Sequence, residues 1–386
     1  MRKSLSDVCA FADGRVAIAD LDLDTYISTE NMLPNKEGVT RSAGLPTVTQ
    51  TQAYQAEDVL VSNIRPYFKK IWYADRDGGC SNDVLVLRAK DGCNPGFLYY
   101  LLSDDNFFDY STATAKGTKM PRGDKGAIMR YEVPDLPIDV QVGIADTLSA
   151  LDARIAENRA INNHLEQMAQ AIFKSWFVDF EPFGGVMPGD WQEVPLGEVL
   201  EIRTKALNPQ SCPDTVLEHY SIPAFDETRL PVFELASEIK SNKYVVDKDC
   251  FLISKLNPTT KRIWRPYCIS RHPVCSTEFI VYRAKNPAQK DFYYSVIDSP
   301  VFTDFLLSHI TGSTGSRQRA IPSETLSFPA IAPPDDVIAD FCDKLAAIYA
   351  HFEQNHLESR RLRQVRDSLL PRLMSGELSV ADVDAK

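Results

Sequence analysis

The chain has 386 residues, of which 44% are hydrophobic and 25% are charged, and its formal net charge is −11 at pH 7. This length fits two to three domains of ordinary size, and the composition is typical of a globular protein with more than one core. There is no run of about 18 apolar residues, so no membrane span is expected, and the acidity argues against an indiscriminate nucleic-acid binder.

The first 137 residues predict a mixed α/β globular domain. Two β-rich runs, DVLVSNI (58–64) and DVLVLRA (83–89), are bounded by the Gly, Pro and Asn residues that commonly end strands. A short aromatic-rich helix is expected within NPGFLYYLLSDDNFFDYS (94–111), with its aromatic side chains in the core. A basic loop with a glycine near its start, KGTKMPRGDKGAI (116–128), follows this helix.

A long helix is predicted within residues 138–182, because apolar residues recur there in alternating steps of four and three, the spacing of a coiled-coil seam. The apolar seam residues are Ile144, Leu148, Leu151, Ile155, Leu165 and Ile172. Asn158 and Asn162 fall in the middle of this seam, where buried amides are known to fix register and partner. The aromatic cluster SWFVDFEPF (175–183) either packs against the following domain or forms a partner site.

The second half of the chain repeats the first. LSDV (5–8) is matched by LGEV (196–199), EDVLVSNIRP (57–66) by DCFLISKLNP (249–258), and KGTKMPRG (116–123) by TGSTGSRQ (311–318). The offset between matched blocks stays between about 191 and 197 residues, which indicates a tandem duplication. Residues 183–333 therefore predict a second globular domain, and residues 334–386 predict a second long helix. The seam of that helix is Phe341, Leu345, Ile348, Phe352, Leu362 and Leu369.

Two long helices in one chain are expected to pair with each other. The predicted fold is therefore α+β, or mixed α/β. It is a tandem duplication of a globular domain followed by a long helix, and the two helices form an antiparallel coiled coil.

Two kinds of basic loop occur once in each copy, and we interpret both as candidate DNA contacts. Backbone amides and hydroxyl groups can donate to phosphate oxygens, while Lys, Arg and Gln side chains can reach phosphates or base edges. The glycine-containing loops supply Lys116, Gly117, Thr118, Lys119, Arg122, Ser313, Thr314, Arg317, Gln318 and Arg319. The basic–aromatic stretches NIRPYFKKIWY (63–73) and KLNPTTKRIWRPY (255–267) supply Arg65, Lys69, Lys70, Lys255, Lys261, Arg262 and Arg265. The alternative is that these loops are solvated connectors whose glycines only turn the chain.

The duplication, the Gly-Thr/Ser loop before each helix, the helix start PIDVQVGIADTLSALD (137–152) and the helix end IFKSWFVDFEPF (172–183) resemble the specificity subunits of type I restriction–modification systems. This resemblance implies two target-recognition domains, each of which reads half of an asymmetric, bipartite site in double-stranded DNA. It also implies that the helices dock two DNA methyltransferase subunits and that ATP-dependent restriction subunits join the full complex.

The sequence offers little for catalysis by this chain alone, since it has no Walker loop, no methyltransferase signature and no nuclease-like carboxylate–lysine cluster. Its eight cysteines lack metal-ligand spacing and predict reduced thiols in a cytoplasmic protein without a metal or cofactor. One other function stays open: a coiled-coil adaptor with two protein-binding domains. Salt-sensitive DNA binding would separate the two, because only phosphate contacts release counterions.

Overall fold

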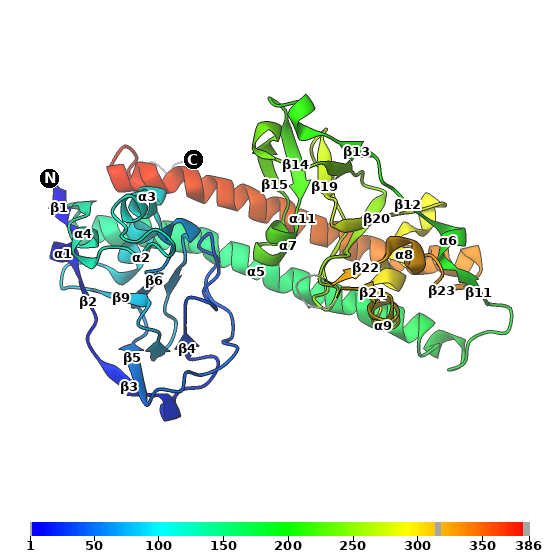
Figure 1. Ribbon diagram of the computed structural model, residues 1–386, viewed down its shortest axis with the longest axis horizontal. Helices are drawn as coiled ribbons and strands as arrows, with labels where there is room; N and C mark the ends of the chain where they lie inside the picture. The colour runs from blue at the N-terminus through cyan, green and yellow to red at the C-terminus, as the bar shows by residue number, and fades with distance from the viewer. Residues whose placement is uncertain (1, 313–317, 381–386) are drawn as a thin grey trace. The chain divides into compact units, whose positions relative to one another are not determined.

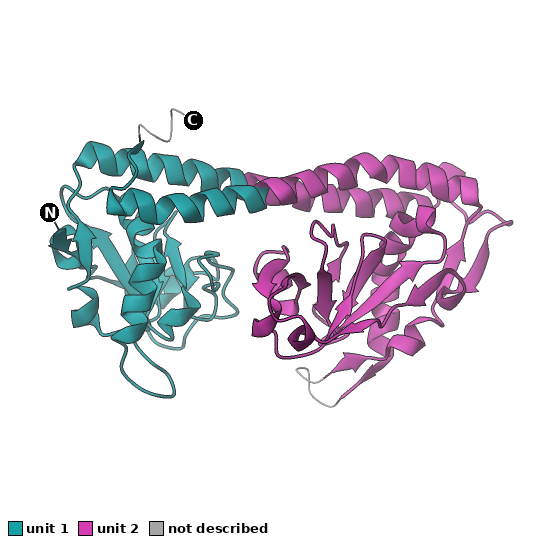
Figure 2. Cartoon of the chain, turned by 90° about the horizontal axis from the view of Figure 1, so that it is seen from above, with its two compact units in different colours: residues 1–156, 359–386 teal, residues 157–358 magenta. Residues whose placement is uncertain are grey.

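The computed structural model describes residues 2–312 and 318–380. It divides into two compact units: unit 1 comprises residues 1–156 and 359–386, and unit 2 comprises residues 157–358 (Figure 2). Each unit consists of a β-rich globular part and a stretch of each of the two long helices (Figure 1). The predicted mixed α/β fold with two long helices is therefore confirmed.

Unit 1 contains two four-stranded sheets. The first is antiparallel, with the strand order β2–β9–β6–β7, and its strands are β2 (Cys9–Phe11), β6 (Val59–Ser62), β7 (Ile71–Tyr73) and β9 (Val84–Ala89). The two predicted β-rich runs form the central strands β6 and β9. Val59 and Val61 of β6 join one core cluster and Leu60 joins another. Both faces of this strand are covered, which explains its unbroken apolar sequence.

The second sheet of unit 1 has the strand order β3–β5–β8–β4, and β4 and β8 run parallel. Its strands are β3 (Arg15–Ala17), β4 (Tyr26–Ile27), β5 (Gln50–Tyr54) and β8 (Gly78–Cys80). A small antiparallel pair, β1 (Arg2–Ser4) with β10 (Glu132–Pro134), joins the beginning of the globular part to its end. The short helices are α1 (Leu5–Val8), α2 (Pro95–Ser103), α3 (Asp105–Ala113) and α4 (Lys125–Ile128).

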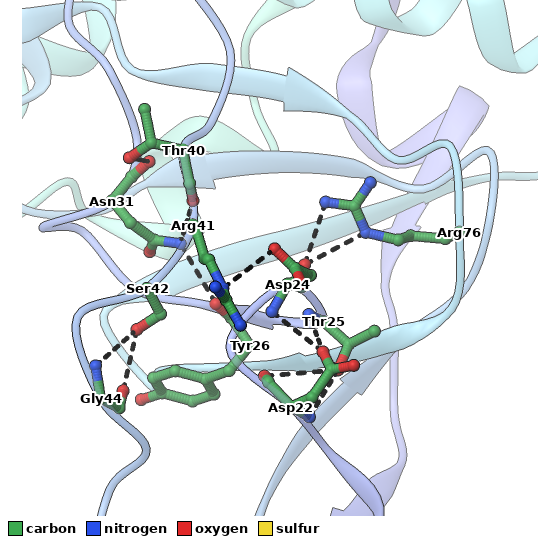
Figure 3. A network of polar contacts seen from close by, with 10 residues as sticks. All are labelled: Asp22, Asp24, Thr25, Tyr26, Asn31, Thr40, Arg41, Ser42, Gly44 and Arg76. Carbon is green, nitrogen blue, oxygen red and sulfur yellow. Dashed lines mark hydrogen bonds and ion pairs between the residues drawn. The ribbon is translucent and has the colours of Figure 1, made fainter.

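Side-chain hydrogen bonds as well as backbone bonds hold the chain between β4 and β5 of unit 1 (Figure 3). The amide nitrogen of Asn31 donates to the carbonyls of Tyr26 and Thr40, at 3.1 and 2.8 Å. Nearby, the guanidinium of Arg76 donates to the carbonyl of Asp24, at 2.9 and 3.1 Å. These side chains therefore satisfy backbone carbonyls before, within and after β4, and they help to tie the connection to its domain.

Unit 2 repeats both sheets. The order β12–β20–β17–β18 corresponds to the first sheet of unit 1, and the order β13–β16–β19–β14 corresponds to the second, with β15 added beside β14. The parallel pair recurs as β14 with β19. The strands of the two sheets are β12 (Leu200–Ile202), β13 (Ala206–Leu207), β14 (Val216–Tyr220), β15 (Val232–Leu235), β16 (Lys243–Val245), β17 (Cys250–Ser254), β18 (Ile263–Trp264), β19 (Pro273–Ser276) and β20 (Phe279–Ala284).

The remaining elements of unit 2 also follow the pattern of unit 1. The strands β11 (Gln192–Pro195) and β23 (Pro329–Ala332) pair antiparallel, as β1 and β10 do. The short helices are α6 (Leu196–Val199), α7 (Ile222–Glu227), α8 (Lys290–Asp298), α9 (Pro300–Ser308) and α10 (Pro322–Thr325). Apart from the additions α7, β15 and the strands β21 (Ile310–Thr311) and β22 (Arg319–Ala320) in unit 2, the strands and helices follow the same order in both units, as expected of a tandem duplication.

The aromatic-rich segment of each unit forms two helices, not the single helix that the sequence predicts. In unit 1, Asp104 has an extended backbone, and its side chain accepts a hydrogen bond from the amide of Asn106 at 2.8 Å. In unit 2, Ser299 accepts from the amide of Phe302 at 3.2 Å and precedes Pro300. Each of these residues ends one helix and caps the next, which is the preferred role of Asp and Ser at a helix N-terminus.

The two long helices are α5 (Ile138–Phe177) and α11 (Asp335–Ser375). In unit 1, Ile144 and Leu148 of α5 share a core cluster with Leu370 and Leu373 of α11. A carboxylate adds a polar tie, because Asp152 of α5 accepts from Arg366 of α11 at 2.6 Å and from Tyr100 of α2 at 2.8 Å. The start of α5 therefore packs beside the end of α11.

In unit 2 the end of α5 packs beside the start of α11. Asn162 accepts from the side-chain amide of Asn355 at 2.9 Å, and the side-chain amide of Asn158 donates to Glu358 at 2.9 Å. Residue numbers rise along one helix as they fall along the other, so the two helices are antiparallel here. Asn158 and Asn162 are almost completely buried, and they lie in the middle of the seam, where the sequence places them.

The predicted seam residues differ in their burial. Ile144, Leu148, Ile155, Phe341, Leu345 and Ile348 are buried, whereas Leu151, Leu165, Ile172, Phe352, Leu362 and Leu369 are half-buried. Near the end of α5 the most buried side chains are Phe173 and Phe177, one position after the predicted Ile172 and Trp176. In unit 2, strands and short helices pack against this end of α5 in addition to α11. The buried face of α5 is therefore shifted by one residue from the predicted seam.

The aromatic cluster at the end of α5 packs against its own unit. Phe177 contacts Trp191 and Phe292, with ring centroids 5.7 and 4.9 Å apart, and Phe183 contacts Trp191 at 4.8 Å. Of the two roles that the sequence leaves open for this cluster, packing against the following domain accounts for these contacts.

Among the described residues, the structure contains no helix long and apolar enough to cross a membrane.

Candidate nucleic-acid interface

In unit 1, three segments that are far apart in the sequence meet just after strand β6. Lys116 and Arg122 exchange two backbone hydrogen bonds of 2.8 and 2.9 Å, which close the predicted glycine loop as a hairpin. Arg122 also pairs with Ile64 in a β-bridge. The amide of Asn63 donates to the carbonyl of Asp83, the residue before β9, at 2.8 Å. The hairpin, the residues after β6 and the start of β9 therefore form one junction.

Unit 2 builds the same junction. The strands β21 (Ile310–Thr311) and β22 (Arg319–Ala320) pair antiparallel, with Thr311 opposite Arg319 (Figure 1). Arg319 forms a β-bridge with Leu256, which follows β17. The amide of Lys255 donates to the carbonyl of Glu278, the residue before β20, at 2.9 Å. The backbone pattern of unit 1 is thus repeated bond for bond.

The residue after each β-bridge has the same unusual backbone in both units. Arg65 has a φ of 50° and Asn257 a φ of 49°, and both precede a proline. Their amides donate to the carbonyls of Pro121 and Gln318, at 2.8 and 2.9 Å. A side chain in this left-handed region is strained, and such strain persists only where the surroundings impose it, often at functional sites.

The glycine of each predicted loop also has a positive φ, 97° at Gly117 and 105° at Gly312. Side chains rarely adopt this backbone conformation, so both loops require glycine at this position. The backbone conformation of the turn is therefore sufficient to explain the glycine in each loop.

An arginine–carboxylate pair lies at each junction. Arg122 forms an ion pair with Asp83, with Nη2 2.9 Å from the carboxylate, and Arg319 donates from Nε and Nη2 to Glu278 at 3.0 and 3.3 Å. The arginine side chains keep 55% and 45% of their surface exposed, so both guanidinium groups remain accessible. Sequence reasoning missed the two carboxylates. The available signal was that each is the first residue of a matched β-rich run, DVLVLRA (83–89) and EFIVYRA (278–284).

The predicted DNA-contacting residues of the glycine loops lie at or beside these junctions. Lys116, Gly117, Thr118, Lys119 and Arg122 are exposed, and so is Arg319, whereas Gln318, Arg65 and Lys255 are half-buried. The hydrogen bond from Lys116 lowers the pKa of the Asp124 carboxyl to about 2. Ser313, Thr314 and Arg317 fall outside the residues that the structure describes.

Five of the seven predicted cations of the basic–aromatic stretches are bound within their own units. Lys70 donates to the carbonyl of Thr29 at 2.6 Å. Four more form ion pairs, which are Lys69–Asp105 (3.0 Å), Lys261–Asp298 (2.7 Å), Arg262–Asp226 (2.6 Å) and Arg265–Asp291 (2.8 Å). The structure thus divides the predicted set into accessible cations on the hairpins and cations that bind their own unit.

Arg265 joins the globular part of unit 2 to a long helix, and its side chain is only 18% exposed. It stacks over the ring of Tyr349 of α11, with its guanidinium 4.6 Å from the ring centroid, and it lines a cavity of about 420 Å³ in unit 2. Aromatic side chains such as Phe173, Tyr294 and Phe352 line the same cavity. Arg265 therefore joins the globular part of unit 2 to α11.

The β-bridges correct the alignment of the two glycine loops. The matched blocks KGTKMPRG and TGSTGSRQ place Arg122 opposite Arg317, but the bridges to Ile64 and Leu256 make Arg319 its equivalent. Arg122 follows Lys116 by six residues, whereas Arg319 follows Thr311 by eight, so the loop of unit 2 is two residues longer.

In the described part of the chain, no group of three or more His, Cys, Asp or Glu side chains is placed to hold a metal ion.

Comparison with known proteins agrees with this architecture. A family model for the type I restriction modification DNA specificity domain matches residues 1–167. The Type I restriction enzyme HindI specificity subunit of Haemophilus influenzae is 24% identical over 436 residues, covering 92% of this chain and 94% of the relative. The Type I restriction enzyme MjaIX specificity subunit of Methanocaldococcus jannaschii is 24% identical over 327 residues, covering 76% of this chain and 71% of the relative.

A solved structure shares the fold. The S subunit of the type I restriction–modification system of M. genitalium aligns with a TM-score of 0.55 over 97% of this chain and 96% of that chain, at 16% sequence identity. Its fold is thus the one seen here, with two β-rich domains and two long paired helices. The family model over residues 1–167 and the relatives that match along most of their length thus agree that the chain is similar to the DNA specificity subunits of type I restriction–modification systems, and the solved structure shows the same fold.

Proposed function

We propose that the two units read the two halves of a bipartite site in double-stranded DNA, each through the junction of its hairpin with the loop after β6 or β17. The single observation that carries this proposal is that the same junction is built twice by matched backbone bonds. In this proposal residues 1–137 and 183–333 are the recognition domains, and residues 138–182 and 334–386 are the spacers between them.

The two junctions share a backbone but differ in their side chains, which supports an asymmetric site. Arg65 of unit 1 corresponds to Asn257 of unit 2, and Lys116 corresponds to Thr311. Tyr67 and Phe68 are exposed in unit 1, where unit 2 has two threonines in the same positions after its proline. Because base identity is read by the donors and acceptors of a few side chains, two such surfaces favour two different half-sites.

The exposed hairpin cations supply the local positive charge that an acidic chain needs in order to approach DNA. We assign Lys69, Lys70, Lys261, Arg262 and Arg265 to the support of the loops. Carboxylates or carbonyls of their own units bind them, and they are less exposed than the hairpin cations Lys116, Arg122 and Arg319, which also form ion pairs. The reading surface then consists of Lys116, Gly117, Thr118, Lys119, Arg122, Arg65, Lys255, Gln318 and Arg319.

The test measures how binding to DNA that carries the full site depends on salt, with the chain assembled with its methyltransferase subunits. The site is first identified from the methylation pattern of host DNA. Replacing exposed Lys119 with Glu should weaken binding and reduce the salt slope by about one, because one phosphate contact is lost. Lys3→Glu changes the same charge at an ion pair on β1 and is the control. Equal salt slopes for wild type and K119E would place the DNA elsewhere.

We also propose that the helices dock two methyltransferase subunits, and that ATP-dependent restriction subunits join them in the cytoplasm. The support is apolar surface on the helices: Val142 of α5 is 37% exposed and Leu357 of α11 is 40% exposed. Val142→Glu and Leu357→Glu should reduce co-purification of the methyltransferase subunit with the full chain. Val48→Glu, at a 56% exposed position in the loop before β5, is the matched control. Loss of the partner with V48E and not with the helix variants would contradict the proposal.

A further inference from the structure

Besides the loop glycines and the prolines after Arg65 and Asn257, the arginine–carboxylate pairs are the feature of the two junctions that changes least between the units. Other equivalent positions differ in charge or size, as Arg65 and Asn257 do, but the arginine and its acidic partner are both kept. The acid is Asp83 in unit 1 and Glu278 in unit 2, and the longer Glu side chain makes two bonds to its arginine. A shared ion pair with a changed acidic side chain indicates that the pairing itself matters.

A carboxylate at this position has a cost in a DNA-binding surface. DNA phosphates repel it, and it neutralises part of the charge that attracts them. An exposed ion pair also contributes little to folding stability, so stability does not explain the two acids. The remaining physical effect is orientation, because a carboxylate that binds one edge of a guanidinium restricts where the other edge points.

The bonds in unit 2 show which edge is used. Glu278 binds Nε and Nη2 of Arg319, at 3.0 and 3.3 Å. Among the described residues, these bonds occupy the Nε–Nη2 edge and leave the Nη1–Nη2 edge for two further acceptors. Two acceptors side by side are what guanine presents in the major groove, at O6 and N7, and Arg binds them in a bidentate manner.

We propose, on the basis of the function proposed above, that Asp83 and Glu278 are positioning residues that orient Arg122 and Arg319, and that each arginine reads a guanine in its half-site. The carboxylates do not touch DNA. They limit the guanidinium to the orientation that suits a base edge, and they disfavour its use as a general phosphate contact.

The experiment uses the full chain assembled with its methyltransferase subunits. A pool of duplexes carries one half-site intact and the other randomised, and the sequences that become methylated are counted. For the wild type, each half-site should contain a G·C pair that is required. Asp83→Asn should lower the preference for that pair about tenfold in one half-site only, and Glu278→Gln should do the same in the other, because one bidentate base contact is disordered. Binding to unrelated DNA should stay the same or strengthen.

Three variants complete the test. Asp83→Glu, which installs the side chain that unit 2 uses, should keep the preference. Asp340→Asn removes an exposed carboxylate of α11 that is paired with Lys344, and it should change neither half-site. Arg122→Ala should abolish the same preference that D83N weakens.

Two results would overturn the inference. The first is an unchanged preference in D83N and E278Q while R122A loses it, which leaves the proposed DNA surface intact. The second is a uniform loss of affinity for all sequences, which would assign the arginines to phosphates. If R122A and Arg319→Ala both match the wild type, the proposed surface itself is wrong.

Discussion

Phe341 is expected to be one of the most sensitive positions in unit 2, and its truncation tests how α11 is held. Its side chain is fully buried, and its ring lies 4.9 Å from Phe177, 6.0 Å from Phe173, 6.1 Å from Trp176 and 6.0 Å from Phe292, centroid to centroid. It therefore joins α11 both to α5 and to helix α8. Truncation of a buried Phe to Ala costs about 3–5 kcal/mol, since apolar contacts are lost and a cavity is left.

For a unit of about 200 residues, a loss of 4 kcal/mol lowers the melting temperature by roughly 8–16 °C. We expect this shift for Phe341→Ala in scanning calorimetry, together with faster amide hydrogen exchange in unit 2. Val301→Ala, at a position on α9 that is 57% exposed, should shift the melting temperature by less than about 2 °C and is the control. If F341A melts within 2 °C of the wild type, the aromatic cluster does not hold α11 to its unit.

Three further predictions concern the helices. Leu345→Asp should destabilise unit 2 by several kcal/mol in chemical denaturation, because it buries an unpaired charge. Leu151→Asp should cost clearly less stability, because Leu151 is only half-buried. Equal losses of stability in the two variants would contradict the observed burial of the seam. Burial of His356 lowers the pKa of its imidazole from 6.5 to about 4. The neutral imidazole therefore causes no loss of folding stability above pH 6.5, and the free energy of unfolding falls by up to about 1.4 kcal/mol per pH unit between pH 6.5 and 4. His356→Gln should reduce this acid sensitivity in urea titrations at pH 7 and pH 5, and an unchanged difference between the two pH values would assign it to other groups. Removing four residues from each long helix, at facing positions, shortens the spacer by about 6 Å and should shorten the gap between half-sites by about two base pairs. The methylation pattern should then show the old half-site bases with a new gap, and changed bases with an unchanged gap would show that the helices do not set the spacing.

The duplication and the two long helices could be predicted from local patterns. Matched blocks such as EDVLVSNIRP and DCFLISKLNP recur at a nearly constant offset, and a seam spacing of three and four residues is a property of the chain itself. The same pattern placed Asn158 and Asn162 in the seam, where the structure buries them. Apolar periodicity is sufficient for these features, because it reports directly on which face of an element is buried.

The split of each aromatic-rich segment into two helices was within reach of the sequence, but it was missed. Asp104 and Ser299 are both favoured helix caps, and a proline follows Ser299. The run of aromatic residues on both sides of each cap favoured one continuous helix. A local signal was therefore present, and the hydrophobic pattern outweighed it.

Tertiary structure alone decided which cations are accessible and which residues meet at the junctions. Arg265 and Arg319 look alike in the sequence, but Asp291 and Tyr349 enclose the first, while the second lies exposed beside Glu278. Their partners come from other elements, and no local pattern specifies such pairings. The equivalence of Arg122 with Arg319 also depends on β-bridges, because a loop that is two residues longer shifts the sequence match and leaves the backbone pairing in place.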